Sequence, residues 1–240
     1  MLSTMKAPLS YCTDATWVGR ADCQRCDIRE SVLFSDLNES DLSSMLQPVD
    51  NLFLPAKATL YREGDAGDGI FTIRKGLIRL VHYAPNGTRR IVRLLKPGSV
   101  GGLEVLVNSH YRHTAEAVSD VNLCRIPVDV IAQMKGRNPA LHTALMTRWQ
   151  DSLDDADTVI TQLSTGSAQA RAARFLLQVV VDPQRDECYN LSREDTAALL
   201  GLTVETVSRV FAEFKRKGWL VEGGDCPRIS VTDLEQLATG

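Results

Sequence analysis

Three polar residues at helical spacing, Glu205, Ser208 and Arg209, carry hydrogen-bonding groups that can read the edges of DNA bases. Arginine pairs with the O6 and N7 acceptors of guanine, glutamate accepts from the cytosine amino group, and serine serves either way. Lys215 and Arg216 follow in the same stretch, where cations contact phosphates and fix position rather than sequence. These residue types in this order predict sequence-specific DNA binding.

A helix-turn-helix would position these side chains, and the flanking residues are of the types that this motif needs. Ser192 can cap a first short helix, and Thr203 can cap a second, with Thr206 in its first turn as a further candidate for DNA contact. Gly201 suits the turn between the helices because glycine adopts positive φ without steric cost. The buried side of the second helix is marked by apolar residues at 3/4 spacing, namely Val207, Val210, Phe211 and Phe214. The opposite face of such a recognition helix enters the major groove.

The residues after the second helix predict a small β-hairpin wing, in which 221–225 turn into 228–231. The alternative to DNA binding is a short helical hairpin with a solvated charged face. Because the whole chain has a net charge of −3, any basic patch for nucleic acid must be local. Residues 201–220 contain four basic and two acidic side chains, which is a modest local excess of positive charge.

Length and composition restrict the class of protein. A chain of 240 residues forms one large or two small domains, each able to bury a core. No run of 18 apolar residues is present, and the N-terminus lacks the apolar core of a signal peptide, so we expect a cytoplasmic protein with no membrane partner. The six cysteines are then expected as thiols or metal ligands rather than disulfides. No catalytic Ser/His/Asp set or P-loop is evident, so we expect no enzyme; a metal-dependent enzyme is a remote alternative.

Short β-rich runs separated by glycine fill the chain from about residue 52 to 128. They predict an antiparallel barrel or roll, with strands at 59–61, 70–73, 77–81 and 91–95. Asn86-Gly87 lies between two of these runs and is a strong hairpin signal. Ahead of the roll, Ser40–Leu46 predicts a short helix.

A long helix is predicted after Pro139, because apolar and small residues recur three or four apart from Leu141 onward. So narrow a stripe suggests a second copy of the helix as partner, with packing against the chain's own roll as the alternative. The dimer-interface candidates are Leu145, Trp149, Ser152, Ala156, Val159 and Leu163. Gly166-Ser167 then marks a hinge into a helix at 168–181.

A β-roll, a long dimer helix and a C-terminal winged helix together resemble the Crp/Fnr family of bacterial transcription regulators over nearly the whole chain. The Fnr branch is the most similar, since its recognition helix carries Glu-x-x-Ser-Arg, found here from Glu205 to Arg209. The resemblance implies an α+β fold and a homodimer that binds double-stranded DNA at pseudo-palindromic sites. It also implies TTGAT and ATCAA half-sites read by Glu205, Ser208 and Arg209, and RNA polymerase as a partner. The expected divisions are a cysteine-bearing segment (1–30), a β-roll sensor domain (31–137), a dimerisation helix (138–165) and a winged helix-turn-helix domain (166–240).

The same resemblance implies an oxygen- or redox-sensitive [4Fe–4S] cluster, held in the Fnr branch by three N-terminal cysteines and one in the roll. Thiolates are soft donors suited to iron. Cys23 and Cys26 match the Cys-x-x-Cys of that pattern, and Cys124 matches the cysteine in the roll. Residues 31–34 offer no thiol at the third position, and Cys12 is the candidate that completes the set.

Other sensors remain as alternatives within the regulator class. The cysteines would also suit a zinc site, a thiol switch of Cys23 and Cys26 alone, or a purely structural role. A small molecule in the roll is a further alternative. Cyclic nucleotide binding is disfavoured, because Leu103 stands where the family has its ribose-binding glutamate and His113 where it has its phosphate-binding arginine. Arg112 is one position away, so a shifted register stays open.

Four aspartates crowd the middle of the long helix, at positions 151, 154, 155 and 157. They form either a solvated acidic face or a set of like charges that weakens pairing until a cluster or ligand tips the balance. Ala156 stands where the Fnr branch can have an aspartate, which should ease pairing here. The resulting hypothesis is that cluster loss alters helix packing or DNA affinity.

Overall fold

The computed structural model describes residues 14–23, 25, 26, 28, 33, 34, 49–135, 138–182, 184–223 and 226–239. The predicted helix Ser40–Leu46 and the candidate ligand Cys12 lie outside the described residues. The chain groups into two compact units, an N-terminal unit (Met1–Ile78 and Leu95–Arg148) and a C-terminal unit (Arg79–Leu94 and Trp149–Gly240). None of the helices in the described ranges is both long and apolar enough to cross a membrane.

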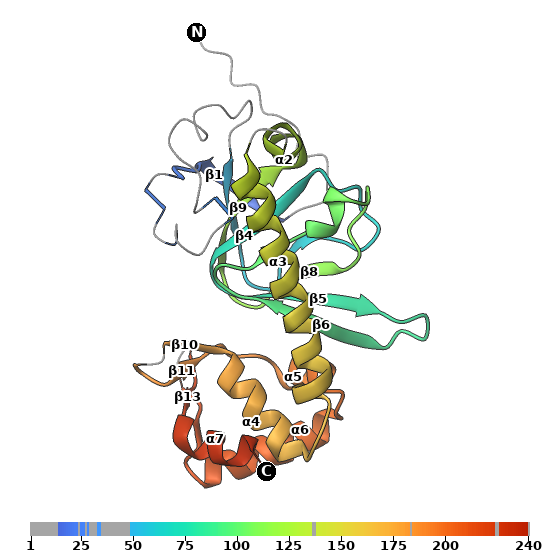
Figure 1. Ribbon diagram of the computed structural model, residues 1–240. Helices are drawn as coiled ribbons and strands as arrows, with labels where there is room; N and C mark the ends of the chain where they lie inside the picture. The colour runs from blue at the N-terminus through green and yellow to red at the C-terminus, as the bar shows by residue number, and fades with distance from the viewer. Residues whose placement is uncertain are drawn as a thin grey trace. The chain divides into compact units, whose positions relative to one another are not determined.

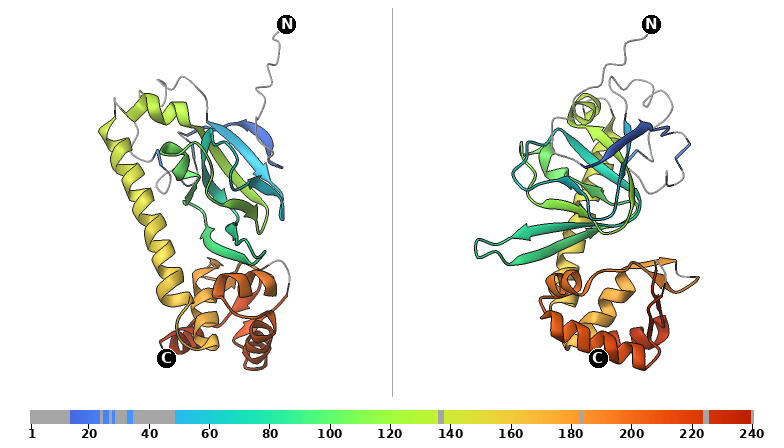
Figure 2. Two further views of the ribbon diagram at one scale, coloured as in Figure 1. Left: turned by 90° about the vertical axis from the view of Figure 1, so that its right-hand side faces the viewer. Right: turned by 180° about the vertical axis from the view of Figure 1, so that it is seen from behind.

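The expected antiparallel β-roll is present, and its two sheets are seen in Figures 1 and 2. One sheet has the order β1-β2-β9-β4-β7, and the other has the order β3-β8-β5-β6. The strands of the first sheet are β1 (Thr16–Arg20), β2 (Asp50–Leu54), β4 (Gly69–Lys75), β7 (Val100–Gly101) and β9 (Val121–Pro127). The strands of the second are β3 (Thr59–Tyr61), β5 (Ile78–Tyr83), β6 (Arg89–Leu95) and β8 (Thr114–Ala117). All four predicted strands are confirmed, three of them with somewhat different ends.

Stacked aromatic rings fill part of the roll's interior. The ring centroids of Tyr61 and Tyr111 lie 3.9 Å apart, and Phe71 stacks on Tyr61 at 5.7 Å. The Tyr111 hydroxyl donates a hydrogen bond to the Gly69 carbonyl, so this buried phenol is satisfied. These rings help to fix the sheet that carries the thiol-bearing strand β9.

Short helical elements and one long helix follow the strands of the roll. A single 3₁₀ turn, Leu103–Leu106, precedes β8, and α2 (Val128–Lys135) follows β9. The long helix α3 (Pro139–Thr158) continues into a π-helical turn, Val159–Leu163, and Figure 2 shows α3 as an uninterrupted ribbon. Gly166 then adopts a φ of 85°, and Ser167 caps the next helix by accepting from the Ala170 N–H.

The part of the C-terminal unit that follows Ser167 contains four helices and a small sheet among its described residues (Figure 1). Its helices are α4 (Ala168–Gln178), α5 (Arg193–Leu200), α6 (Val204–Arg216) and α7 (Val231–Ala238). Its sheet has the order β10-β11-β13-β12, from β10 (Val180–Asp182), β11 (Glu187–Cys188), β12 (Leu220–Val221) and β13 (Arg228–Ile229). The wing is therefore β12 paired with β13.

Two elements of the C-terminal unit also end or begin differently from the prediction. The helix expected over 168–181 stops at Gln178, because the following β-branched residues leave the helix and pair with β11 as a strand. Val231, expected in the wing, is the first residue of α7 because Ser230 begins that helix.

Candidate DNA interface and thiol pocket

Helix α5 is fixed at both ends by the residues predicted for this. The Ser192 hydroxyl accepts a hydrogen bond from the Asp195 N–H at 3.0 Å, which satisfies an otherwise orphaned donor. Gly201 ends the helix at φ 60°, a left-handed conformation that favours glycine. The turn brings the chain directly to Thr203, whose hydroxyl accepts from the Thr206 N–H at 3.2 Å and caps α6.

Helix α6 buries one side and exposes the other. Its buried residues are Val207, Val210, Phe211 and Phe214. Glu205, Ser208 and Arg209 are exposed in the N-terminal half of the helix, as the spacing predicted. A solvent-facing acid, hydroxyl and guanidinium therefore stand together on one face of a capped helix.

The electrostatics of this face favour an ionised Glu205. Its own backbone N–H, the Thr203 hydroxyl and the charge of Arg209 lower the pKa of the Glu205 carboxyl. Arg209 is also held by its neighbours, since its Nη2 lies 3.5 Å from the Thr206 hydroxyl oxygen. The charge of Arg209 thus favours the ionised form of Glu205, while Arg209 itself contacts Thr206.

Cations surround the wing, and Glu222 contacts two of them. Lys215 Nζ lies 2.6 Å from Glu222 Oε2, and Arg193 pairs with the other carboxylate oxygen. Arg193 also lies over the Phe211 ring, 4.2 Å from its centroid. Arg216 is exposed. Lys215 and Arg216 were predicted from the sequence, whereas Arg193 and Glu222 were not, because Glu222 contacts Arg193 only in the folded wing.

The long helix presents a different stripe from the predicted one. Leu145 and Leu163 are 5% and 1% exposed, so both are already buried within the chain. Trp149, Ser152, Ala156 and Val159 are half-buried. The large apolar side chains that remain exposed on the long helix and its π turn are Met146, Leu153 and Ile160, at 50%, 58% and 65%. Their seven-residue spacing is that of a coiled-coil seam.

Three of the four predicted thiol ligands line one pocket in the N-terminal unit. Cys23 and Cys26 come from the segment after β1, and Cys124 comes from β9. The pocket is also lined by Thr72 and Arg74 of β4. Within the described ranges, no three His, Cys, Asp or Glu side chains are arranged to hold a metal ion as they stand.

Polar groups of the sheet face Cys124. The Cys124 thiol donates a hydrogen bond to Asn51 Oδ1 at 3.3 Å, and Arg74 Nη1 donates to the same oxygen at 3.4 Å. Thr72 lies opposite Cys124 in the β4–β9 pair, and its hydroxyl oxygen is buried without a hydrogen-bond partner among the described residues. A hydroxyl donor, a guanidinium and three thiols at one pocket suit the negative charge of thiolate ligands.

The remaining described cysteines belong to the C-terminal unit. Cys188 is fully buried, and burial together with the nearby Cys226 raises its pKa to about 12. Its thiol therefore stays protonated near neutral pH and is not a reactive thiolate.

Two family models match the two parts of this architecture. Residues 52–138 match the cyclic nucleotide-binding domain, and residues 170–239 match the Crp-like helix-turn-helix domain. This chain belongs to the Crp/Fnr family. Its members are transcription regulators, so the chain is a DNA-binding regulator, in agreement with the expectation that it is not an enzyme.

Relatives of the regulator are similar along most of its length. Regulatory protein HlyX of Actinobacillus pleuropneumoniae is 27% identical over 236 residues, which cover 94% of this chain and 98% of that protein. The fumarate and nitrate reduction regulatory protein of Escherichia coli K12 is 28% identical over 229 residues, 90% of each chain. The solved structure of FixK2 from Bradyrhizobium japonicum has the same fold, with a TM-score of 0.70 and 24% identity over 79% of this chain and 96% of that one.

Proposed function

We propose that this regulator is a homodimer that reads a two-fold DNA site with TTGAT-like half-sites, and that the pocket thiols sense the redox state or a diatomic gas. The observation that carries the DNA-reading part is the exposure of Glu205, Ser208 and Arg209 on the capped end of α6. Arg209 takes a guanine, and Glu205 accepts from a cytosine amino group. Thr203 and Thr206 lie beside them at the helix start.

Phosphate contacts come from the cations that surround the reading face. Lys215 and Arg216 lie in the last turn of α6, and Arg193 lies at the first turn of α5. Glu222 pairs with both Lys215 and Arg193, so it partly neutralises these two cations in the free protein. Such contacts position the protein on the duplex without reading its sequence.

The dimer contact runs along α3 and its π turn. Met146, Leu153 and Ile160 supply exposed apolar seam positions seven residues apart, with Trp149 and Ala156 between them. Covering these side chains with a second copy removes apolar surface from water at about 25 cal/mol per Å². A dimer also matches the two-fold symmetry of the DNA site, since each helix-turn-helix reads one half-site.

The sensor function rests on the convergence of Cys23, Cys26 and Cys124 on one pocket. We infer a [4Fe–4S] cluster whose fourth ligand is Cys12. Such a cluster supplies an oxygen- and nitric-oxide-sensitive redox centre when bound. The chain's own part is to present soft thiolates, to offset their charge with Arg74 and to offer the Thr72 hydroxyl as a donor. RNA polymerase is proposed as the partner of the DNA-bound dimer.

A thiol switch is the second candidate, because it needs only Cys23 and Cys26, which line the pocket together. A zinc site, which needs four ligands as the cluster does, remains a further alternative. Cyclic nucleotide binding stays disfavoured, because Leu103 is buried at the position of the ribose contact.

Anaerobic purification separates these sensors. We expect a brown protein with about four iron atoms per chain that bleaches in air. Cys124→Ala and Cys12→Ala should both abolish the colour, whereas Cys188→Ala should keep it. A colourless anaerobic protein with one zinc per chain would replace the cluster with the zinc site. A metal-free protein whose DNA affinity follows the oxidation of Cys23 and Cys26 would replace it with the thiol switch.

A further inference from the structure

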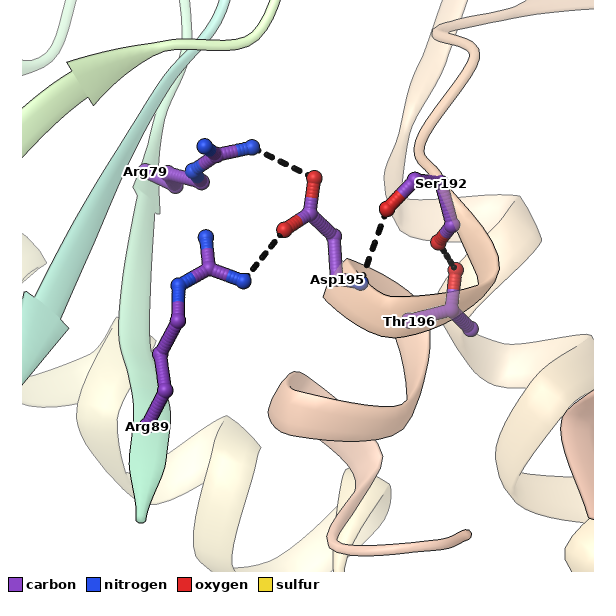
Figure 3. A network of polar contacts seen from close by, with 5 residues as sticks. All are labelled: Arg79, Arg89, Ser192, Asp195 and Thr196. Carbon is purple, nitrogen blue, oxygen red and sulfur yellow. Dashed lines mark hydrogen bonds and ion pairs between the residues drawn. The ribbon is translucent and has the colours of Figure 1, made fainter. Parts of the chain in front are cut away.

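A buried carboxylate on α5 receives two arginines from the β5–β6 hairpin (Figure 3). Arg79 Nη1 lies 2.5 Å from Asp195 Oδ2, and Arg89 Nη1 lies 2.6 Å from Asp195 Oδ1. The carboxylate is only 7% exposed, and the two guanidinium side chains are 17% and 24% exposed. We call these three residues the Asp195 clamp. All three belong to the C-terminal unit, although Asp195 lies 116 and 106 positions from its partners in the sequence.

The helix itself does not need the Asp195 carboxylate. Ser192 caps α5 through its hydroxyl, and its carbonyl accepts from the Thr196 hydroxyl at 2.9 Å (Figure 3). The pKa of the neighbouring Glu194 is lowered, first by its own backbone N–H and then by the Ser192 hydroxyl, so an acid already serves the helix start.

Helix α7 shows what the equivalent carboxylate does without a hairpin partner. Asp233 stands three residues after Ser230, just as Asp195 stands three residues after Ser192. The Asp233 carboxylate accepts a hydrogen bond from the hydroxyl of its own cap residue. Asp195 instead points at the hairpin, so the hairpin explains why an acid is buried at this position.

The β5–β6 hairpin places positive charge near both ends of α5. The hairpin residues Arg79–Leu94 include four arginines and no acid. A Cβ added to Gly201, at the end of α5, would lie 2.8 Å from Arg90 Nη1, so a cation stands where helix carbonyls carry partial negative charge. Arg171 lies near the same end of α5, and burial and then the charge of Arg90 lower the pKa of its guanidinium. A buried carboxylate is costly unless it is paired, and the two arginines of the clamp provide the pairing.

We propose that Asp195 is a positioning residue that sets the direction in which α6 presents its reading face. Helix α5 leads into α6 through the turn at Gly201, so a fixed α5 fixes the recognition helix. Within the C-terminal unit, the clamp ties α5 of the helix-turn-helix to the β5–β6 hairpin. The inference rests on the proposed function, because the direction of α6 matters most when the two recognition helices of a dimer must bind two half-sites at once.

Half-site spacing measures this directional restraint. Each base pair inserted between half-sites rotates the second one by about 35° around the duplex. A helix-turn-helix held by the clamp cannot follow that rotation. Wild type should therefore bind a site with altered spacing at least about tenfold more weakly than the site with the preferred spacing. A helix-turn-helix that is released from the clamp can follow the rotation, but it then loses conformational entropy when it binds. The released protein should bind the preferred site more weakly and should distinguish the spacings by less than about threefold.

The test measures dissociation constants for full-length wild type and Asp195→Asn on TTGAT/ATCAA duplexes that differ only in the number of central base pairs. Asp233→Asn is the matched control, because it makes the same change at the same helix position where the carboxylate contacts only its own cap. Arg89→Gln removes one partner and keeps the Arg79 pair, so it carries the test if Asp195→Asn does not fold. The flattened spacing profile is expected in the clamp variants alone.

An unchanged spacing preference in a folded clamp variant would overturn the proposal, and so would a wild type that accepts all spacings equally. Failure of the proposed function looks different: wild type would then bind a two-fold site no better than a single half-site. Hydrogen exchange adds a readout in free protein. Asp195→Asn should speed exchange in Arg79–Leu94 at least about tenfold, relative to Asp233→Asn, if the carboxylate holds the hairpin.

Discussion

Thr72 lies directly opposite Cys124 in the antiparallel pair of β4 and β9, with its hydroxyl oxygen buried and without a hydrogen-bond partner among the described residues. Directly opposed residues in such a pair have neighbouring side chains on one face of the sheet. The hydroxyl is thus a donor held next to the thiol before any metal is bound. An unpaired buried hydroxyl costs free energy, and it can donate a hydrogen bond to a negative sulfur ligand that faces it.

Replacing Thr72 with valine separates these two effects. Thr72→Val keeps the shape and removes an unsatisfied hydroxyl, so we expect the free energy of unfolding of the metal-free protein to rise by about 1 kcal/mol. The same variant should lose its metal or cluster faster than wild type. Urea unfolding and metal release to a chelator measure the two quantities.

Thr114 is the matched control for that measurement. Thr114 is also buried, but its hydroxyl accepts a hydrogen bond from the Glu63 N–H at 3.1 Å. Thr114→Val should therefore lower the free energy of unfolding by about 1 kcal/mol. If both variants were destabilised alike, Thr72 would have a partner in the metal-free protein and its assigned role would fail.

Burial of Cys188 makes stability depend on alkaline pH. Its pKa is about 12 in the folded chain, above the value of 9.0 for an ordinary thiol. The unfolded chain therefore releases this proton first, and the stability that the buried thiol contributes is full below pH 9 and is lost as pH rises toward 12. Cys188→Ala should flatten the fall in the free energy of unfolding across this window. An equally steep fall in that variant would assign the pH dependence to other groups.

Glu222 is predicted to restrain two phosphate-binding cations. Glu222→Gln removes a negative charge beside Lys215 and Arg193, so DNA affinity at low salt should increase. The slope of log K against log salt should steepen by about 1, since one more phosphate is neutralised. Binding titrations at several salt concentrations measure the slope. A shallower slope with weaker binding would mean that the carboxylate is needed to orient the cations.

The exposed stripe on α3 predicts the effect of a charge on dimerisation. Leu153→Glu places a carboxylate at a seam position next to several aspartates and should shift the regulator to monomers in sedimentation experiments. Thr147→Glu, at an exposed position on another side of the helix, should leave the dimer intact. Dissociation by Thr147→Glu alone would move the interface to a different face of the helix.

Local signals explain which parts of the fold could be predicted from sequence. Ser192, Gly201 and Thr203 act on their own neighbours, so the helix-turn-helix follows from residue types alone. The roll strands follow from apolar runs and glycine-rich turns in the same way. The exposed apolar stripe of the long helix was not predicted, because Leu145 and Leu163 have the spacing of a seam yet are buried within their own chain.

Long-range contacts explain the rest. Cys124 meets Cys23 and Cys26 only because β9 lies inside a five-stranded sheet of the described chain, and the resemblance rather than the spacing indicated it. The Asp195 clamp joins segments more than one hundred positions apart and leaves no local pattern. The sequence around Glu222 likewise gives no sign that its carboxylate pairs with two cations in the folded wing.

Base-by-base binding of Arg209 and Arg216 variants tests the central claim that α6 reads DNA sequence. Arg209→Ala should cost about 1–3 kcal/mol on the intact TTGAT/ATCAA site and little on a site whose half-site guanine is replaced, because the lost contact is to that base. Arg216→Ala should weaken binding to both sites equally. If Arg209→Ala weakened both sites by the same factor, Arg209 would contact only the backbone and the assigned reading face would be wrong.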